Sequence, residues 1–283
     1  MRRFRARGNG LELSVVAWEP RAAPRATCLV IHGFMDAAAS FDRVAPALAD
    51  EGIRVVAPDM RGFGESDWIS GGGYYHFPDY VADLDFLSRE ILPEKFFVVG
   101  HSMGGTIATY FAGARLERIE RLALLEGVGP PDGHDALFPL RMKKWLDDLN
   151  AADSRANAPM TDDEALRRLA AFHARVPIEV LRTRMPHLAK RNADGTLSWR
   201  FDPLHRTTSP APFFASAYRA FAARIAQPVL YVTGGALGWR VEDEAERIAS
   251  FPNARHEDIE GAGHMMHWTA PDALARLLVE LFA

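Results

Sequence analysis

The chain is 283 residues long and carries 33 lysines and arginines against 37 aspartates and glutamates, a formal net charge of −4. Hydrophobic residues make up 48% and charged residues 25% of the chain, as in ordinary globular proteins. This length favours one large α/β domain, or a core with an inserted subdomain, over several small domains. The slightly acidic balance excludes the strongly basic surface of proteins that bind phosphate backbones, so we expect no nucleic-acid partner.

The number of cysteines and the lengths of the apolar runs indicate in which cellular compartment the protein is expected. The single cysteine, Cys28, has no partner for an internal disulfide and lies in an apolar run, which is typical of a buried structural thiol. No run of 18 apolar residues is present, and the arginine-rich segment 1–7 leads into a polar turn rather than an apolar segment. We therefore expect no membrane span, no secretory signal and a cytoplasmic location.

The first half of the chain alternates short apolar runs with helical segments, which is the βαβ pattern of a mostly parallel sheet. Strands at 4–8 and 11–18 flank Gly8-Asn9-Gly10, a strong hairpin signal, so we expect the sheet to begin with an antiparallel pair. Parallel strands, apolar enough for burial on both faces, are expected at 27–31, 53–57, 96–99, 121–125, 228–232 and 255–259. Helices are expected at 41–50, 79–91, 104–116, 242–250 and 271–282. The fold class is thus α/β, with helices on both faces of the sheet.

About a hundred residues separate the strands expected at 121–125 and 228–232, far more than one crossover helix needs. Helical patterns in this stretch lie at 138–149, 162–175, 178–185 and 210–224, the second opened by the capping-box residues Thr161 and Glu164. A helical insertion at the carboxyl ends of parallel strands covers the usual ligand crevice. We therefore divide the chain into a core at 1–127 and 225–283 and a helical cap, or lid, at 128–224.

The most specific local motif is Gly100-His101-Ser102-Met103-Gly104, which lies between an apolar strand and a helical segment. In this context a Gly-x-Ser-x-Gly sequence is typical of a nucleophile elbow. The glycines permit a sharp turn that holds the serine exposed in a strained conformation. Ser102 is therefore the candidate nucleophile.

A serine hydroxyl needs a base to take its proton, so a histidine must approach Ser102. Among ten histidines, His264 is favoured because it lies in a glycine-bounded loop between the last expected strand and the terminal helix. His101, beside the nucleophile, is expected to pack or to form a hydrogen bond, and His267 either lines the pocket or supports the loop. Because no carboxylate or cysteine cluster accompanies His264 and His267, we expect no metal site.

Backbone amides near the nucleophile are candidates for an oxyanion hole, which a tetrahedral intermediate requires. Met103 follows the nucleophile directly, and Phe34 lies in the loop after the strand at 27–31. We expect the backbone N–H groups of Phe34 and Met103 to form this site.

Four motifs together resemble the α/β-hydrolase superfamily across the whole core. They are His32-Gly33-Phe34, the string from Asp59 to Ser66, the string from Gly100 to Gly105, and Gly261-Ala262-Gly263-His264. The string from His32 to Arg43 is similar to the serine-hydrolase-like subgroup, whose members are capped and esterase-like. The resemblance implies an eight-stranded sheet, a serine–acid–histidine triad in that chain order, and hydrolysis of an acyl bond without a cofactor.

The acid of the triad departs from the common pattern of the superfamily, which has an aspartate in a Gly-x-x-Asp string after the penultimate strand. Leu237 occupies that position here. Glu126 ends the apolar strand at 121–125 and resembles the acid of haloalkane dehalogenases, which follows the same strand. A carboxylate at the end of a buried strand needs a partner. We expect Glu126 to orient the base; the alternatives are a solvated Glu126 and an acid at Glu242 or Asp243.

These features predict a serine hydrolase that cleaves a carboxylic ester of small to medium size through an acyl-enzyme on Ser102. The same triad also serves thioester, lactone and carbon–carbon hydrolases and perhydrolases, and a noncatalytic receptor for a small ligand is the competing class. The residues expected to line an apolar acyl pocket under the cap are Trp145, Phe172, Met185, Tyr218 and His267, with Trp199, Phe213 and Phe214 as further candidates. The sequence carries no signal about oligomeric state.

Overall fold

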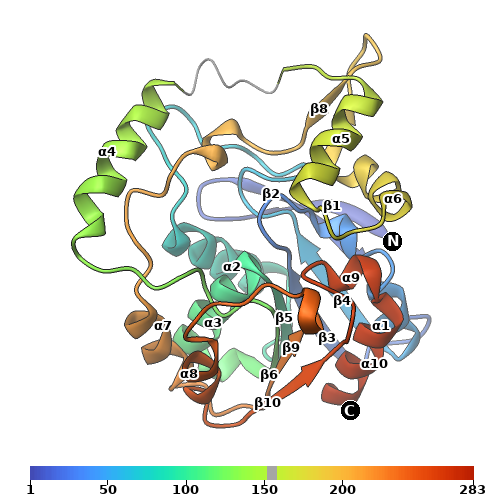
Figure 1. The fold of residues 1–283 in the computed structure, drawn as a ribbon. Coiled ribbons are helices and arrows are strands. Elements are labelled where there is room, and N and C mark those ends of the chain that lie inside the picture. The colour runs from blue at the N-terminus through green and yellow to red at the C-terminus, as the bar shows by residue number, and fades with distance from the viewer. Residues whose placement is uncertain (152–157) are drawn as a thin grey trace.

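A computed structural model describes residues 1–151 and 158–283 and contains an eight-stranded sheet (Figure 1). Its spatial order is β1-β2-β4-β3-β5-β6-β9-β10. The strands are β1 (Arg2–Arg7), β2 (Glu12–Trp18), β3 (Ala26–Ile31), β4 (Ile53–Pro58), β5 (Phe96–His101), β6 (Ile119–Leu125), β9 (Val229–Thr233) and β10 (Ala254–Asp258). β2 is antiparallel to both β1 and β4, and the remaining pairs are parallel. The expected fold class, a mostly parallel α/β sheet that opens with an antiparallel hairpin, is confirmed.

Burial separates the central strands from the last one. β3, β5 and β9 are buried over nearly their whole length, as their apolar composition predicts, and Cys28 lies fully buried in β3. β10 differs, because it is an edge of the sheet and exposes Arg255, His256 and Asp258. The expectation that this strand is covered on both faces is wrong, since charged side chains suit an edge that meets solvent.

Helices cover both faces of the sheet (Figure 1). One layer contains α2 (Phe77–Ile91), α3 (Met103–Ala114), α7 (Ala215–Ala222) and α8 (Glu244–Ala249), and the other contains α1 (Ala45–Asp50), α9 (Met266–Thr269) and α10 (Pro271–Leu281). Short 3₁₀ helices occupy Ala38–Phe41, Leu116–Arg118, Pro203–Arg206 and Gly235–Leu237. Each layer buries its own apolar cluster, because successive side chains along a strand point to opposite faces. No helix in the described ranges is long and apolar enough to cross a membrane.

The chain between β6 and β9 contains both helices and strands. Its elements are α4 (Leu137–Asn150), α5 (Asp162–Phe172), α6 (Ile178–Leu188), α7 and a hairpin of β7 (Ala189–Arg191) and β8 (Leu197–Trp199). Figure 1 shows α4, α5, α6 and β8 on one side of the molecule, above the sheet. The segment is mainly helical, as expected, but it also contains a hairpin that was not expected, because the turn at 192–195 connects two short strands. α7 packs against α3 in a helical layer of the sheet, so the part that rises above the sheet is shorter than 128–224.

Backbone hydrogen bonds attach the residues after β8 to the core. Gly64 N–H donates to the carbonyl oxygen of Arg200 at 2.7 Å, and Asp202 N–H donates to the carbonyl oxygen of Gly62 at 2.8 Å. These bonds join the hairpin to the loop that follows β4. The position of the hairpin is therefore fixed by the backbone of the core and not by side chains alone.

Candidate active site

Ser102 lies at the sharp turn between β5 and α3. Its φ of 52° and ψ of −119° are an unfavourable conformation for a residue with a side chain. Glycine is required nearby because the backbone is crowded: an ideal Cβ on Gly104 would lie 2.3 Å from the carbonyl oxygen of Ile31, and one on Gly105 would lie 2.5 Å from Gly127 Cα. The turn leaves Ser102 partly exposed at the carboxyl edge of the sheet.

A continuous chain of hydrogen bonds joins Ser102, His264 and Glu126, which we call the Ser–His–Glu chain. The distance from Ser102 Oγ to His264 Nε2 is 3.1 Å, and that from His264 Nδ1 to Glu126 Oε2 is 2.8 Å. Because an ionised carboxylate can only accept hydrogen bonds, His264 donates its Nδ1–H to Glu126 and leaves Nε2 to accept the hydroxyl proton of Ser102. In this tautomer the imidazole is oriented to act as a general base toward a serine nucleophile.

Glu126 is fully buried at the end of β6, and its carboxylate has backbone partners as well as His264. Oε1 accepts the N–H of Gly234 at 2.6 Å, and Oε2 accepts the N–H of Trp239 at 2.7 Å. The loop after β9 wraps closely around the carboxylate, since an ideal Cβ on Gly238 would lie 2.1 Å from Oε1. These hydrogen bonds compensate the buried carboxylate for the loss of water.

The alternative acids lie elsewhere. Asp243 forms an ion pair with Arg247, with 2.6 Å between Arg247 Nη2 and Asp243 Oδ1, and Glu242 is exposed. Leu237, at the position where the superfamily pattern has an aspartate, is 43% exposed. Of the carboxylates considered from the sequence, Glu126 is the one that contacts the imidazole.

The loop after β3 passes directly beside Ser102. An ideal Cβ on Gly33 would lie 3.2 Å from Ser102 Cβ and 2.7 Å from His101 Nδ1, and the second distance is too short for any side chain, so glycine suits this close approach. Phe34 is the next residue, and Met103 is the first residue of α3, where backbone N–H groups have no acceptor within the helix. The loop that carries Phe34 and the first residue of α3, Met103, thus both adjoin Ser102.

Two further histidines lie buried behind His264. His267 Nε2 is 2.9 Å from Asp36 Oδ2, and His101 Nε2 is 2.8 Å from the carbonyl oxygen of His264. The expectation that no carboxylate accompanies His267 is wrong, because Asp36 reaches it from 231 positions away in the chain. The possible metal-ligating atoms of Asp36, His101 and His267 lie within 4.8 Å of one another. In this arrangement both Nε2 atoms and the carboxylate form the hydrogen bonds just described.

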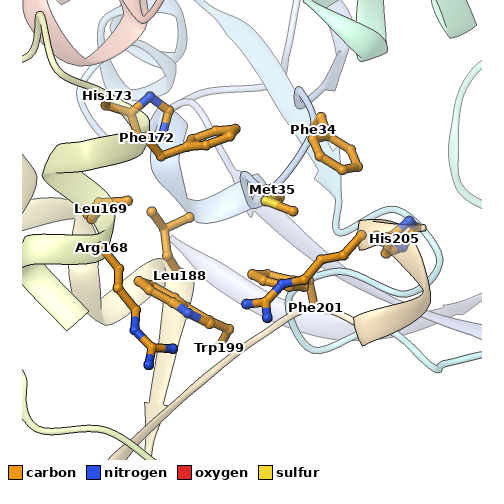
Figure 2. A pocket seen from close by; sticks show the side chains of 11 residues that line it. Phe34, Met35, Arg168, Leu169, Phe172, His173, Leu188, Trp199, Phe201 and His205 are labelled. Atoms are coloured by element: carbon orange, nitrogen blue, oxygen red, sulfur yellow. The ribbon is translucent and has the colours of Figure 1, made fainter. Parts of the chain in front are cut away.

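A cavity of about 410 Å³ begins at the loop after β3 and is bordered by α5 and the β7–β8 hairpin (Figure 2). It is lined by Phe34, Met35, Arg168, Leu169, Phe172, His173, Leu188, Trp199, Phe201, His205 and Arg206. Figure 2 shows Phe172 and Phe34 on facing sides. Burial lowers the pKa of His173 to about 4 and that of His205 to about 3, so both are neutral at pH 7. The lining is mainly apolar and aromatic, with two arginines as its charged members.

Phe172 and Trp199, which were expected to line an acyl pocket, line this cavity. The other expected residues do not. Trp145 packs edge-on against Tyr74, Met185 packs against the core, Tyr218 hydrogen-bonds Thr109, and His267 binds Asp36. Phe213 and Phe214 also lie outside the lining. Helical periodicity separates buried from exposed faces, but it does not separate a face toward a cavity from one toward the core. For the same reason, no local signal pointed to Leu188, Phe201 or His205.

Two curated relatives align with much of the chain. A serine hydrolase-like protein of Danio rerio is 30% identical over 185 residues, which cover 65% of this chain and 53% of that protein. The chain therefore spans about half the length of this relative. A 3-hydroxybutyrate-oligomer hydrolase of Cupriavidus necator is 29% identical over 278 residues, which cover 91% of this chain and 88% of that protein.

Solved structures and a family model extend the similarity to the whole fold. A hypothetical protein from Pseudomonas aeruginosa PAO1 superimposes with a TM-score of 0.85 at 26% identity, and the superposition covers 100% of this chain and 99% of that one. Residues 28–271 match the family model of the alpha/beta hydrolase fold. Because this match includes most of the chain, and the sheet has the order described above, the protein belongs to the α/β-hydrolase fold family.

Proposed function

We propose that the protein is a serine hydrolase that cleaves carboxylic esters of small to medium size through an acyl-enzyme on Ser102. The observation that carries this proposal is the Ser–His–Glu chain, with its contacts of 3.1 Å and 2.8 Å. A hydroxyl at a strained turn, an imidazole in the correct tautomer and a buried carboxylate are the three parts that nucleophilic acyl transfer needs.

The reaction follows from this geometry. His264 Nε2 takes the proton of Ser102 as Oγ attacks the ester carbonyl carbon, and Glu126 stabilises the resulting imidazolium. The backbone N–H groups of Phe34 and Met103 bind the oxyanion of the tetrahedral intermediate. Collapse of this intermediate releases the alcohol, which receives the proton from His264. The same imidazole then activates a water molecule, whose attack on the acyl-enzyme releases the acid and restores Ser102.

The cavity is the proposed site for the acyl part of the substrate. In this assignment the segment 128–224 is the cap, and 1–127 with 225–283 is the core. The assignment is supported by the lining, because Phe172 and Leu188 come from the cap and Phe34 from the core. The loop after β3 borders this cavity through Phe34 and also passes beside Ser102, so it connects the proposed acyl site with the nucleophile.

The choice of an ester bond draws on one relative. Oligomers of 3-hydroxybutyrate are small hydroxy acids joined by ester bonds, and the hydrolase named for them aligns over most of both chains. Serine at position 102 suits an acyl-enzyme. The alkyl-enzymes of haloalkane dehalogenases and epoxide hydrolases, which resemble this architecture, use an aspartate there.

A fluorophosphonate probe and a series of activated esters of increasing acyl length test the proposal. We expect the wild type to be labelled on Ser102 and to hydrolyse the shorter esters. Ser102→Ala should abolish labelling and lower turnover by about 10⁴-fold or more while it leaves folding intact, since the side chain is partly exposed. Substantial hydrolysis by pure Ser102→Ala protein would contradict the nucleophile assignment. A wild type that is neither labelled nor active would indicate a ligand receptor.

A further inference from the structure

We propose that Asp36, His101 and His267 are positioning residues of this active site, and we call them the buried brace. Asp36 lies two residues after the proposed oxyanion donor in the loop after β3. His101 directly precedes the nucleophile, and His267 lies in α9, three residues after the base. The inference rests on the proposed function and gives a role to three side chains that take no part in the steps above.

Two hydrogen bonds and two ring contacts make up the brace. His267 Nε2 donates to Asp36 Oδ2 at 2.9 Å, which joins α9 to the loop after β3. His101 Nε2 donates to the carbonyl oxygen of His264 at 2.8 Å, which joins the nucleophile turn to the loop that carries the base. The centroid of the His101 ring lies 4.8 Å from that of His264 and 4.5 Å from that of His267. The three segments that must meet in the reaction are thus connected through buried side chains.

The hydrogen-bond partners determine the protonation of the brace. Each of the two Nε2 atoms faces an oxygen, so His101 and His267 carry hydrogen on Nε2 and none on Nδ1. Burial lowers the pKa of both histidines, for His267 against the opposing effect of Asp36. Burial acts most strongly on Asp36 and would raise its pKa, but the hydrogen bond from His267, the electrostatic effects of the nearby histidines and the hydrogen bond from Ser40 together outweigh burial and hold this pKa below its usual range. The brace therefore consists of a carboxylate and two neutral imidazoles, and it places no second cation beside the base.

Further contacts hold the brace from its far side. Phe41 stacks on the His267 ring with 4.5 Å between centroids and 16° between planes. Asp36 Oδ1 accepts the N–H of Ala37 at 2.8 Å. An ideal Cβ on Gly33 would lie 2.7 Å from His101 Nδ1, so the loop after β3 also lies against His101. Side chains held on several sides have few alternative rotamers, and this is what precise support of reacting groups requires.

The brace sets a distance on which the proposed reaction depends. The distance between Ser102 Oγ and His264 Nε2 depends on where the loop that carries His264 lies relative to the turn that carries Ser102. The hydrogen bond from His101 to the His264 carbonyl oxygen fixes the relative position of this loop and this turn. A displacement of about 1 Å in a reacting group can cost about 10²-fold in rate. Loss of the brace should therefore lower kcat, whereas KM, which depends on the cavity, should change little.

The test compares His267→Ala, His267→Gln and Tyr231→Phe in ester turnover, fluorophosphonate labelling and Tm. For His267→Ala we expect kcat and the labelling rate to fall about 10- to 100-fold, with KM within about threefold of wild type. His267→Gln retains a donor near the Nε2 position and should recover kcat to within about fivefold of wild type. Tyr231→Phe is the matched control, because it removes a hydroxyl that donates to the buried Glu244 at 2.6 Å, outside the brace. It should lower Tm and leave kcat unchanged.

Each outcome decides the matter. If His267→Ala has a lower Tm but the same kcat as wild type, as expected for the control, the brace proposal is overturned. If His267→Ala does not fold, Asp36→Ala replaces it: this variant removes the acceptor of both the Ala37 N–H and the His267 Nε2–H, so kcat should fall about three- to tenfold. Unchanged kcat in Asp36→Ala would also overturn the proposal. A wild type without labelling or esterase turnover contradicts the proposed function, and the brace with it, before any variant is made.

Discussion

Glu126 Oε2 lies 2.8 Å from His264 Nδ1, although 138 positions separate the two residues in the chain. The carboxylate comes from the end of β6. The loop after β9, where the common superfamily pattern has the acid, supplies instead the N–H groups of Gly234 and Trp239 that bind this carboxylate. The loop thus keeps a part in the site as a donor of hydrogen bonds.

Replacement of Glu126 by Gln should lower kcat by about 10²- to 10⁴-fold, because the neutral amide no longer stabilises the imidazolium and can select the wrong tautomer. Glu242→Gln should be close to wild type. Asp243→Asn should keep kcat within a few-fold but lower the free energy of unfolding by about 1–3 kcal/mol, since the fully buried Arg247 loses its charged partner. Ester turnover and urea denaturation of the three variants check these expectations. If Glu126→Gln kept a kcat close to wild type while Asp243→Asn lost most of its kcat, Asp243 and not Glu126 would be the acid of the triad.

Gly238→Ala should reduce kcat about tenfold or more while every member of the Ser–His–Glu chain is still present. The added methyl would lie 2.1 Å from Glu126 Oε1, so either the carboxylate or the loop must move. The backbone at this position, with φ of −68°, accepts alanine without strain. Gly71→Ala is the control, because none of the described residues other than its chain neighbours lies within 4 Å of its ideal Cβ. Equal kcat in the two variants would show that the loop yields without disturbing the carboxylate.

Leu188→Phe should shorten the longest acyl chain that the protein hydrolyses. Leu188 is a buried residue of the cavity lining, so a larger side chain reduces the space for the acyl group. We expect kcat/KM for long-chain esters to fall about tenfold or more relative to acetyl esters. Ile178→Trp, on the same helix but 46% exposed and outside the lining, should leave the chain-length profile unchanged. A profile that responds equally to both changes would place the acyl group elsewhere.

The free energy of unfolding should fall as the pH drops from about 6.5 toward 4. Burial lowers the pKa of His173 to about 4 and that of His205 to about 3 in the folded protein, against about 6.5 in an unfolded chain. Between these values the unfolded state binds protons that the folded state does not, so each histidine contributes a slope of up to about 1.4 kcal/mol per pH unit. Above pH 7 both states are neutral at these sites and their contribution is constant. Urea denaturation at a series of pH values measures the slope, which His205→Gln should reduce; a flat profile from pH 7 to 5 would contradict the assignment.

Much of the site was accessible from sequence because its parts carry local signals. Ser102 lies in a glycine-rich turn after an apolar strand, Glu126 ends another apolar strand, and His264 lies in a glycine-bounded loop after the last strand, β10. The carboxyl ends of parallel strands meet at one edge of a sheet, so these local patterns predict that the three side chains lie close together. The eight-stranded sheet follows from the same rhythm of apolar runs.

Other parts of the site depend on contacts that leave no local trace. Asp36 and His267 meet across 231 positions, and neither lies in a pattern that indicates the other. β7 and β8 have three residues each, too few to show the alternation of a strand. The identity of the cavity lining depends on how the segment above the sheet is oriented, and this is decided by tertiary packing.

The two walls of the cavity are attached to the protein in different ways. Trp199 and Phe201 lie beside residues whose backbone is hydrogen-bonded to the loop after β4, whereas α5 packs through side chains, chiefly on α6. A substitution in the wall formed by the hairpin therefore also disturbs the core. We expect this wall to tolerate few substitutions. α5, which carries Leu169 and Phe172, can be altered while the sheet stays intact. New substrate preferences should thus be easiest to reach, by natural selection or by laboratory evolution, through substitutions on α5.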